Sequence, residues 1–328
     1  MKKITKVTAA ILMAVIPLAF SCKHNSSNNE EKNTSDPTPQ KEEVIPEDAV
    51  RNWTAASKAT AWSVYGVEDL QKLSEFVNAG NSFEGKTITV KKDIVINKKV
   101  LSDTFEEPAE GSEPGTPNPN LKNLDSIGKG MTLKDDTSDD VAPFSGTFDG
   151  NGKVISGLYI YQGHQGLGFI GIADGATIKN VILVDACIIN RNMQEGDEAK
   201  YGAHDGYDDD RFGGLVGLVD GDGATIENCL FAGVVGSQTA KDRGSPYEYI
   251  GGLVGRAHAD TTAKDCYVFA RIYGSREESS NYVCGKEVEN FEGTNINGDG
   301  NGVDASDYDA DMAADILEAV KAVQANVQ

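Results

Sequence analysis

A short, glycine-bounded apolar motif recurs in the second half of the chain and constrains the fold more than any other feature. The motif has four copies, Gly-Phe-Ile-Gly, Gly-Gly-Leu-Val-Gly twice and Tyr-Val-Cys-Gly, at residues 168–171, 213–217, 251–255 and 282–285. Each of the first three copies is followed by a second related segment, at residues 177–181, 225–229 and 262–266. Self-similarity of this kind indicates a repeat architecture, in which each unit buries its apolar face by stacking on its neighbours.

The spacing of the copies shows where the units vary. Their last glycines are 46, 38 and 30 residues apart, yet the two segments inside each unit keep nearly the same separation. The variation therefore lies in the connections 190–211, 237–249 and 275–281. Short strands rich in Val, Ile and Leu, without crossover helices, favour an all-β solenoid in which each rung adds a strand to several parallel sheets.

Equivalent residues of successive rungs should then stack. We expect Ile178 to lie over Ile226, and Asn180, Asn228 and Asp265 to form a polar column. Side-chain amides stacked in this way can hydrogen-bond the turns of neighbouring rungs. Cys229 and Cys266 should also be neighbours. With Cys187 and Cys284 they are expected to be buried thiols, and disulfides are the alternative.

Two helices are expected at the ends of the stack. Apolar residues recur at helical spacing from Val67 to Ala79, before Gly80, and again from Met312 to Val323. A solenoid has two open ends that would template aggregation unless they are covered. We therefore expect short helical caps at both ends. Between the helices, residues 86–97 alternate as a strand, and residues 145–160 form two strands around a turn at 149–152.

The amino-terminal segment resembles an export signal. Residues 1–21 combine three lysines with an apolar run, which is typical of a signal peptide. The segment Leu18-Ala19-Phe20-Ser21-Cys22 resembles a bacterial lipobox, which implies lipidation at Cys22; the alternative is an ordinary cleaved signal. Residues 22–50 are polar and form a disordered, lipid-anchored tether, so we expect an exported protein anchored in the cell envelope, at the outer membrane or cell surface. The formal charge of −21 disfavours nucleic acid as a partner.

The repeats resemble a known family. The Gly-Gly-Leu-Val-Gly elements at 213–217 and 251–255 look like the GLUG motif of bacterial secreted and surface proteins, and the segment 144–152 resembles the usual lead-in to such repeats. The resemblance implies a right-handed parallel β-helix, here of about five rungs, and implies no activity. It divides the folded chain into a cap and first rung with a long loop (51–143), repeats (144–290), and a linker with a helix (291–328).

The variable connections are the expected binding region. They follow the same strand in each rung, so they should emerge on one side, and loops on a rigid scaffold tend to carry function. Aromatic and charged side chains on these loops can hold a sugar or a peptide. The candidate ligand-binding residues are Tyr201, Tyr207, Asp208, Asp209, Asp210, Arg211, Arg243 and Tyr247. A solvated acidic loop without a ligand is the alternative.

One segment resembles a calcium loop. Residues 295–300 begin like an EF-hand or dockerin loop, and residues 303–308 continue the pattern, although an asparagine replaces the usual first aspartate. The candidate calcium ligands are Asn295, Asn297, Asp299, Asp304 and Asp307. The alternative is a linker into the last helix.

The sequence favours a binding function over catalysis. A β-helix polysaccharide lyase or glycosidase needs paired carboxylates at a defined separation. Asp208, Asp209 and Asp210 are consecutive in one loop, whereas a catalytic pair on stacked rungs would come from neighbouring rungs. We therefore expect a non-catalytic binding or adhesion module for an extracellular glycan or protein. A carbohydrate-active enzyme is the first alternative, and a structural envelope protein without a specific ligand is the second.

Overall fold

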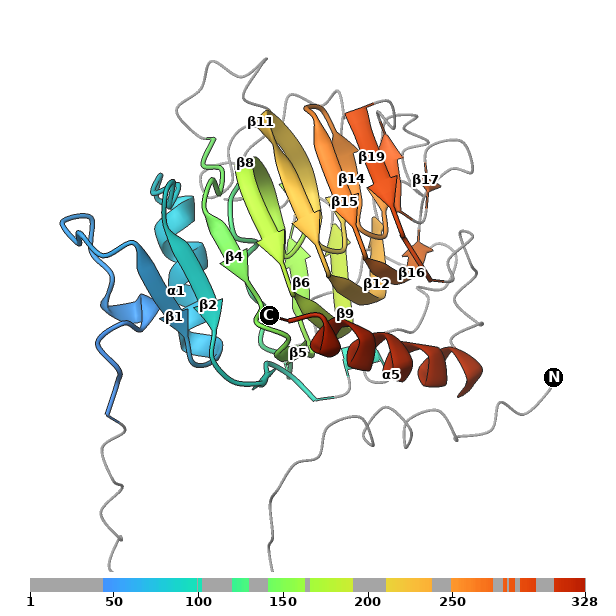
Figure 1. The fold of residues 1–328 in the computed structure, drawn as a ribbon, viewed down its shortest axis with the longest axis horizontal. Helices are drawn as coiled ribbons and strands as arrows, with labels where there is room; N and C mark the ends of the chain where they lie inside the picture. The colour runs from blue at the N-terminus through green and yellow to red at the C-terminus, as the bar shows by residue number, and fades with distance from the viewer. Residues whose placement is uncertain are drawn as a thin grey trace, which may run out of the picture.

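Within the described residues the protein is mostly β, with strands stacked in three parallel sheets and with the helices α1 and α5 (Figure 1). The computed structural model describes residues 44–98, 100–101, 120–129, 141–162, 166–190, 211–237, 249–273, 280–281, 283–286, 290–298 and 310–327. A single 3₁₀ turn, Val50–Asn52, precedes the first strand. All pairings between the named strands are parallel, which gives a β-helix-like arrangement.

The three sheets differ in size. Sheet 1 runs in the order β1-β2-β4-β8-β11-β14-β18, with β15 and β19 beside this path. Its strands are β1 (Ala61–Val64), β2 (Thr87–Val90), β4 (Thr147–Asp149), β8 (Ile170–Lys179), β11 (Val216–Glu227), β14 (Val254–Ala257), β15 (Thr261–Lys264), β18 (Cys284–Lys286) and β19 (Phe291–Thr294). Sheet 2 contains β3 (Ile94–Val95), β5 (Val154–Ser156), β6 (Tyr159–Gln162), β9 (Ile182–Asn190), β12 (Leu230–Ser237) and β16 (Tyr267–Tyr273). Sheet 3 contains β7 (Gly166–Leu167), β10 (Arg211–Gly213), β13 (Tyr249–Gly251) and β17 (Ser280–Asn281).

Each repeat unit passes through sheet 3, then sheet 1, then sheet 2. We call one such passage a rung: β7-β8-β9 is the first, β10-β11-β12 the second, and β13 with β14, β15 and β16 the third. The expected stacking is confirmed, since Ile226 pairs in register with Ile178 on one side and with Ala263 on the other. Sheet 1 has seven successive strands along its path, more than the five levels expected, because β1 and β2 add levels before the repeats.

The glycines of the repeated motif lie where backbone packs directly on backbone. A Cβ on Gly213 would lie 1.9 Å from the carbonyl oxygen of Val216, and a Cβ on Gly251 would lie 1.9 Å from that of Val254. The last glycines of the motif stack in a column, where a Cβ on Gly255 would lie 2.5 Å from the carbonyl oxygen of Gly217. No side chain fits at such distances, so the repeated motif is dictated by the tight corner between sheets 3 and 1.

A polar column marks the corner between sheets 1 and 2. Its residues have φ between 51° and 60°, a left-handed conformation that Asn and Asp tolerate better than other residues with a side chain: Asn180, Asn228, Asp265 and Asn295. The Nδ2 of Asn228 donates to Oδ1 of Asn180 at 2.8 Å, and the Nδ2 of Asn295 donates to Oδ1 of Asp265 at 2.8 Å. The expected column is therefore present, and Asn295 extends it by one rung.

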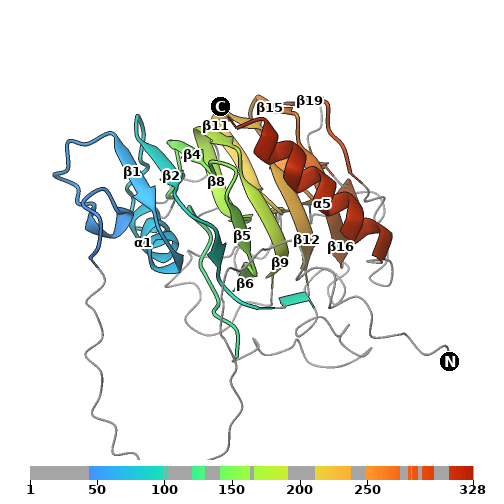
Figure 2. The same cartoon turned by 60° about the horizontal axis from the view of Figure 1, so that its bottom comes forward.

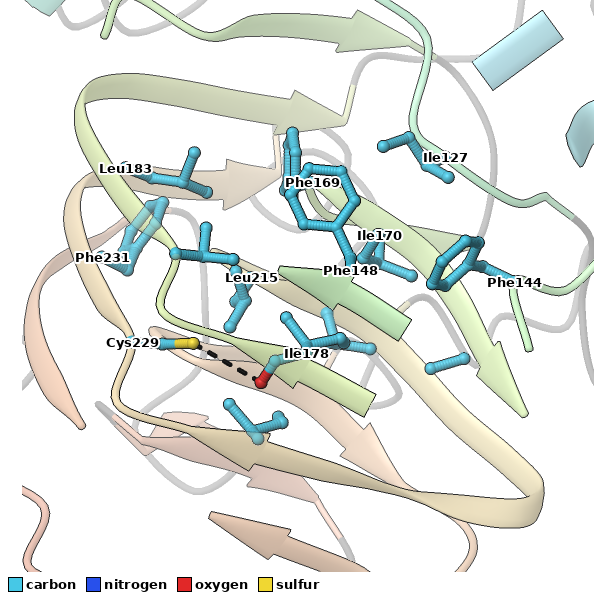
Figure 3. Packing of buried hydrophobic residues seen from close by; sticks show 14 of the residues in the cluster. Ile127, Phe144, Phe148, Phe169, Ile170, Ile178, Leu183, Leu215, Cys229 and Phe231 are labelled. Carbon is cyan, nitrogen blue, oxygen red and sulfur yellow. Dashed lines mark hydrogen bonds between the residues drawn. The ribbon is translucent and has the colours of Figure 1, made fainter. Parts of the chain in front are cut away.

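The interior between the three sheets is apolar (Figure 3). Phe148 and Phe169 meet edge to face, with ring centroids 5.0 Å apart. Helix α1 (Val67–Asn78) lies at the amino-terminal end of the stack, beside β1 and β2 (Figure 1), and its Leu70, Leu73 and Val77 are buried in the same core cluster. The helix expected from Val67 to Ala79 is confirmed, and it ends at Asn78.

The second helix is confirmed, but its expected place is wrong. Helix α5 (Ala310–Ala325) lies across the outer face of sheet 2, over β5, β9, β12 and β16, and does not cover the end of the stack (Figure 2). Its Ile316, Ala319, Val320 and Val323 pack against Val154, Ile182, Val184, Leu230, Ala232 and Phe269. The outward residues of these strands are apolar, so this face requires a cover more than the strand edges do.

Two boundaries also differ from expectation. The stretch 86–97 is two strands, β2 and β3, which belong to different sheets because the chain turns a corner between them. The supposed linker after residue 290 begins with β19, which pairs with β15 in sheet 1. The repeat region therefore continues to Asn297, whose backbone N–H donates to the carbonyl of Cys266 at 2.8 Å.

Replacing a motif glycine should destabilise the stack. We expect Gly251→Ala to lower the free energy of unfolding by about 3 kcal/mol or more, because the new Cβ cannot coexist with the Val254 carbonyl without a backbone shift. Gly66→Ala is the matched control, since a Cβ there meets nothing within 4 Å. Urea denaturation measures both, and equal effects of the two substitutions would contradict the explanation given for the motif.

Helix α5 should stabilise the folded chain through its apolar face. We expect Val320→Asp to cost about 3 kcal/mol and to increase the binding of a hydrophobic dye, because a buried carboxylate would displace the helix from sheet 2. Glu318→Gln on the exposed face of the same helix should change stability by less than about 0.5 kcal/mol. A Val320→Asp variant as stable as the Glu318→Gln control would show that the packing contributes little.

Candidate functional site

The variable connections leave and re-enter the stack along one side. In sheet 2, the last residues of β9 and β12, Asn190 and Ser237, are paired in register. In sheet 3, Arg211 at the start of β10 is paired with Gly166 of β7 and Tyr249 of β13. Successive connections therefore begin beside one another and end beside one another, as the repeat pattern predicted.

Most of the candidate ligand-binding residues lie outside the described residues. These are Tyr201, Tyr207, Asp208, Asp209, Asp210, Arg243 and Tyr247. Arg211 is described, and its expected place in a loop is wrong: it is the first residue of strand β10 and only 3% exposed. Strand pairing with β7 and β13 explains why this residue belongs to the scaffold and not to the connection.

Three side chains form a cluster where the variable connections re-enter the stack, on sheet 3 and the adjoining strand β14. Phe212 and Ile250 are fully buried in the core, so their strand neighbours Arg211 and Tyr249 lie on the opposite, outward face of sheet 3. The guanidinium carbon of Arg256 lies 5.7 Å from the centroid of the Tyr249 ring. Tyr249 is thus flanked by Arg211 on the adjacent strand and by Arg256 on β14. We call Arg211, Tyr249 and Arg256 the Arg–Tyr–Arg cluster.

The cluster combines fixed positive charge with an aromatic face. Guanidinium groups stay protonated and present up to five N–H donors, which suits carboxylate, sulfate or carbonyl acceptors. The two arginines place positive charge close together in a chain whose formal charge is −21. Tyr249 is only 6% exposed, so the cluster is a packed element of the scaffold.

The sequence contained a signal for Arg256 that the motif analysis missed. In sheet 1, Arg256 is paired with Leu218, which in turn is paired with Ile172. Two rungs therefore carry a fully buried aliphatic residue where the third carries Arg256 and the next strand, β18, carries Lys286. A charged residue that breaks a repeat pattern is a better candidate for function than one that follows it.

A second polar group lies at the bend within sheet 1. The carboxylate of Asp220 is buried, and its Oδ1 lies 3.4 Å from Nδ1 of His258 in the next rung. The side chain of Asp174, paired in register with Asp220, accepts the backbone N–H of Asp222 at 2.7 Å. These carboxylates are engaged in shaping the bend. Across the described ranges, no group of three or more His, Cys, Asp or Glu residues is arranged to hold a metal ion.

The calcium prediction is only partly covered by the described residues. Asn295 and Asn297 are described, whereas Asp299, Asp304 and Asp307 are not. The side chain of Asn295 donates to Asp265, and the Nδ2 of Asn297 donates to the carbonyl of Asn295 at 3.2 Å. Both asparagines thus take part in the last turn of the stack, and calcium binding stays a prediction.

Comparison with known proteins assigns no family to the chain. No family model matches the chain, and no curated protein matches its sequence. The crystal structure of a protein from Bacteroides ovatus, described as a putative immunoglobulin A1 protease, is similar over 74% of this chain and 76% of its own, with 12% sequence identity and a TM-score of 0.34. At that level of similarity, nothing about activity carries over to this chain.

The proposed lipidation site at Cys22 lies outside the described residues. Within the part of the chain that the structure describes, no helix is long and apolar enough to cross a membrane.

The Arg–Tyr–Arg cluster should contain a measurable cation–π interaction. A double-mutant cycle with Arg256→Gln and Tyr249→Leu should give a coupling free energy of about 0.5–1 kcal/mol, since the ring and the guanidinium group are in contact. Unfolding in urea supplies the four stabilities. An equivalent cycle with Lys72→Gln in place of Arg256→Gln should give no coupling, because Lys72 lies on α1. A coupling near zero for the first cycle would show that the cluster is not formed in solution.

Proposed function

We propose that the protein is a non-catalytic binding or adhesion module of a bacterial cell envelope, built on a right-handed parallel β-helix. The observation that carries the proposal is the strand register in sheet 3 where the variable connections re-enter the stack. There Arg211 and Tyr249 lie side by side on the adjacent strands β10 and β13. A rigid stack that projects connections of free length from one side is an arrangement suited to recognition, because insertions there leave the core unchanged.

The chemistry of the cluster supports binding over catalysis. The guanidinium groups of Arg211 and Arg256 cannot exchange a proton near neutral pH, so they cannot serve as a general acid–base pair. Arg256 is only partly buried and can hold a ligand, whereas the buried Arg211 belongs to the scaffold beneath it. The buried Tyr249 ring packs against the guanidinium group of Arg256 and so holds this group in place for a ligand. A glycan or a protein segment is therefore the ligand that this cluster suits.

The proposed lipid anchor and tether would hold the stack at a distance from the membrane. A lipid on Cys22 and the polar tether after it would attach the fold at its amino-terminal end, next to α1. The tether ends before the expected residue 50, because Ala49 and Val50 are buried and the carboxylate of Asp48 accepts hydrogen bonds from Ser63 at 2.5 Å and from Tyr65 at 3.0 Å. The side that bears the variable connections would remain accessible to extracellular ligands.

The proposal is tested by retention of the purified chain from residue 44 onward on immobilised glycans and extracellular-matrix proteins. Two variants are compared with the native chain, one with the connection 191–210 shortened and one with Arg256→Ala. We expect each to lose retention at least ~10-fold, the amount expected when a charge-assisted hydrogen bond is removed. Lys72→Ala on α1 is the matched cationic control and should bind normally.

The possible results separate the functions. Retention that both variants keep would remove the binding role from this side of the stack. Release of soluble fragments from a glycan by the native chain would overturn the non-catalytic assignment. Absence of retention on every surface would leave the structural envelope protein as the better description.

A further inference from the structure

One column at the corner between sheets 1 and 2 changes its chemistry in two consecutive rungs. The residue that follows the polar column is Val181 in the first rung and Ile296 in the last, but Cys229 and Cys266 in the two rungs between them. Pairing on both sides of the cysteines fixes their register: Glu227 pairs with Lys264, and Leu230 pairs with Tyr267. Cys229 and Cys266 are therefore direct neighbours.

The two thiols occupy equivalent environments. Both cysteines are fully buried and belong to the central core cluster. The Sγ of Cys229 lies 3.2 Å from the carbonyl oxygen of Glu227 and 3.6 Å from that of Ile178, as Figure 3 shows for the second contact. The Sγ of Cys266 lies 3.3 Å from the carbonyl oxygen of Lys264 and 4.0 Å from that of Ile226. Each sulfur thus reaches back toward the preceding rung, and the two side chains point the same way.

The backbone spacing permits a covalent bond between these sulfurs. Adjacent strands lie about 4.8 Å apart. A disulfide requires Cα atoms roughly 4.4–6.8 Å apart, so neighbours in register fall inside the range.

The two thiols are not equally acidic. A hydrogen bond from Cys229 lowers the pKa of Cys266, whereas burial raises the pKa of Cys229 well above its usual value. Cys266 is therefore the thiol that ionises first and the better nucleophile of the pair.

We propose that Cys229 and Cys266 are an oxidation site, at which a low-molecular-weight disulfide converts the two thiols into a cystine cross-link between consecutive rungs. The Cys266 thiolate attacks one sulfur of the oxidant, forms a mixed disulfide and expels the other half as a thiol. The Cys229 sulfur, after losing its proton, then displaces the second half. The protein loses two protons and two electrons, and the oxidant gains them and is reduced to two thiols.

The cross-link would constrain the chain segment that contains one of the variable connections. It would tie the second rung to the third and close a loop that includes residues 238–248. Tyr249, in the Arg–Tyr–Arg cluster, lies where this connection re-enters the stack. Constraining such a loop restricts the unfolded chain, so the oxidised protein should resist unfolding more than the reduced one.

The other two described cysteines lie elsewhere. Cys187 belongs to a separate cluster on sheet 2, with Tyr159 and Tyr161, and Cys284 is paired with Val254 in sheet 1. None of these four described cysteines forms a disulfide in this structure. We therefore expect Cys229 to form a disulfide with Cys266 and not with Cys187 or Cys284.

The test is to refold the purified chain from residue 44 onward in a mixture of reduced and oxidised glutathione, because refolding gives the oxidant access to thiols that are later buried. Proteolysis without reduction, followed by mass spectrometry, should identify one linked peptide pair, joining Cys229 to Cys266. The midpoint of urea denaturation should be higher for the oxidised chain than for the same chain after reduction. Cys187→Ser and Cys284→Ser should leave both results unchanged, whereas Cys266→Ser should abolish both.

A second variant tests the proposal even if Cys266→Ser does not fold. The double substitution Val181→Cys with Cys266→Ser moves the pair by one rung and should link residue 181 to Cys229. Native chain that refolds without the Cys229–Cys266 link, or that links Cys187 or Cys284 equally well, overturns the proposal. A link that forms but lowers the urea midpoint would overturn its stabilising role.

Discussion

The structure depends on the direct contact of backbone with backbone at the corner between sheets 3 and 1. Gly213 and Gly251 leave no room for a Cβ, and the column from Gly217 to Gly285 lets each corner rest on the one before it. Once the corners coincide, the strands that follow them are in register, and the same residue position recurs at the same place in every rung. The aliphatic, amide and cysteine columns are consequences of that register.

This dependence explains how much could be predicted from the sequence. The parallel sheets, the helix at 67–78, the variable connections on one side and the stacking of Ile178 on Ile226 all follow from a repeat that is visible in the sequence. The position of α5 does not, because the repeat describes the path of the chain and not which outer face is apolar. Residues of β9 such as Ile182 and Val184 look like ordinary strand residues, and only the three-dimensional arrangement shows that they face outward and need a helix over them.

The cover over the part of sheet 2 that contains Tyr159, Cys187 and Val234 could not be predicted from the sequence either. Asp185 has a φ of 52° inside β9, and its carboxylate accepts the N–H groups of Val100 and Leu101 at 2.9 and 3.0 Å. Val100 and its neighbours then cover Tyr159, Cys187 and Val234. Nothing near position 185 in the sequence indicates a partner 85 residues away, so the cover that Val100, Leu101 and Leu121 provide for this part of sheet 2 could not be predicted.

Departures from the repeat are the most informative residues in the molecule, because register makes them recognisable. A column that is aliphatic in every rung needs only apolar packing, so a charged or reactive residue in one rung requires a separate explanation. Arg256 replaces an aliphatic residue beside Tyr249, and Cys229 with Cys266 replaces two aliphatic residues between Val181 and Ile296. Both departures fall within the second and third rungs, which begin where the variable connections re-enter at Arg211 and Tyr249. A fold that tolerates long insertions on one side can acquire specificity there only if the adjacent rungs hold the insertions in place, and these two rungs carry the residues suited to that role.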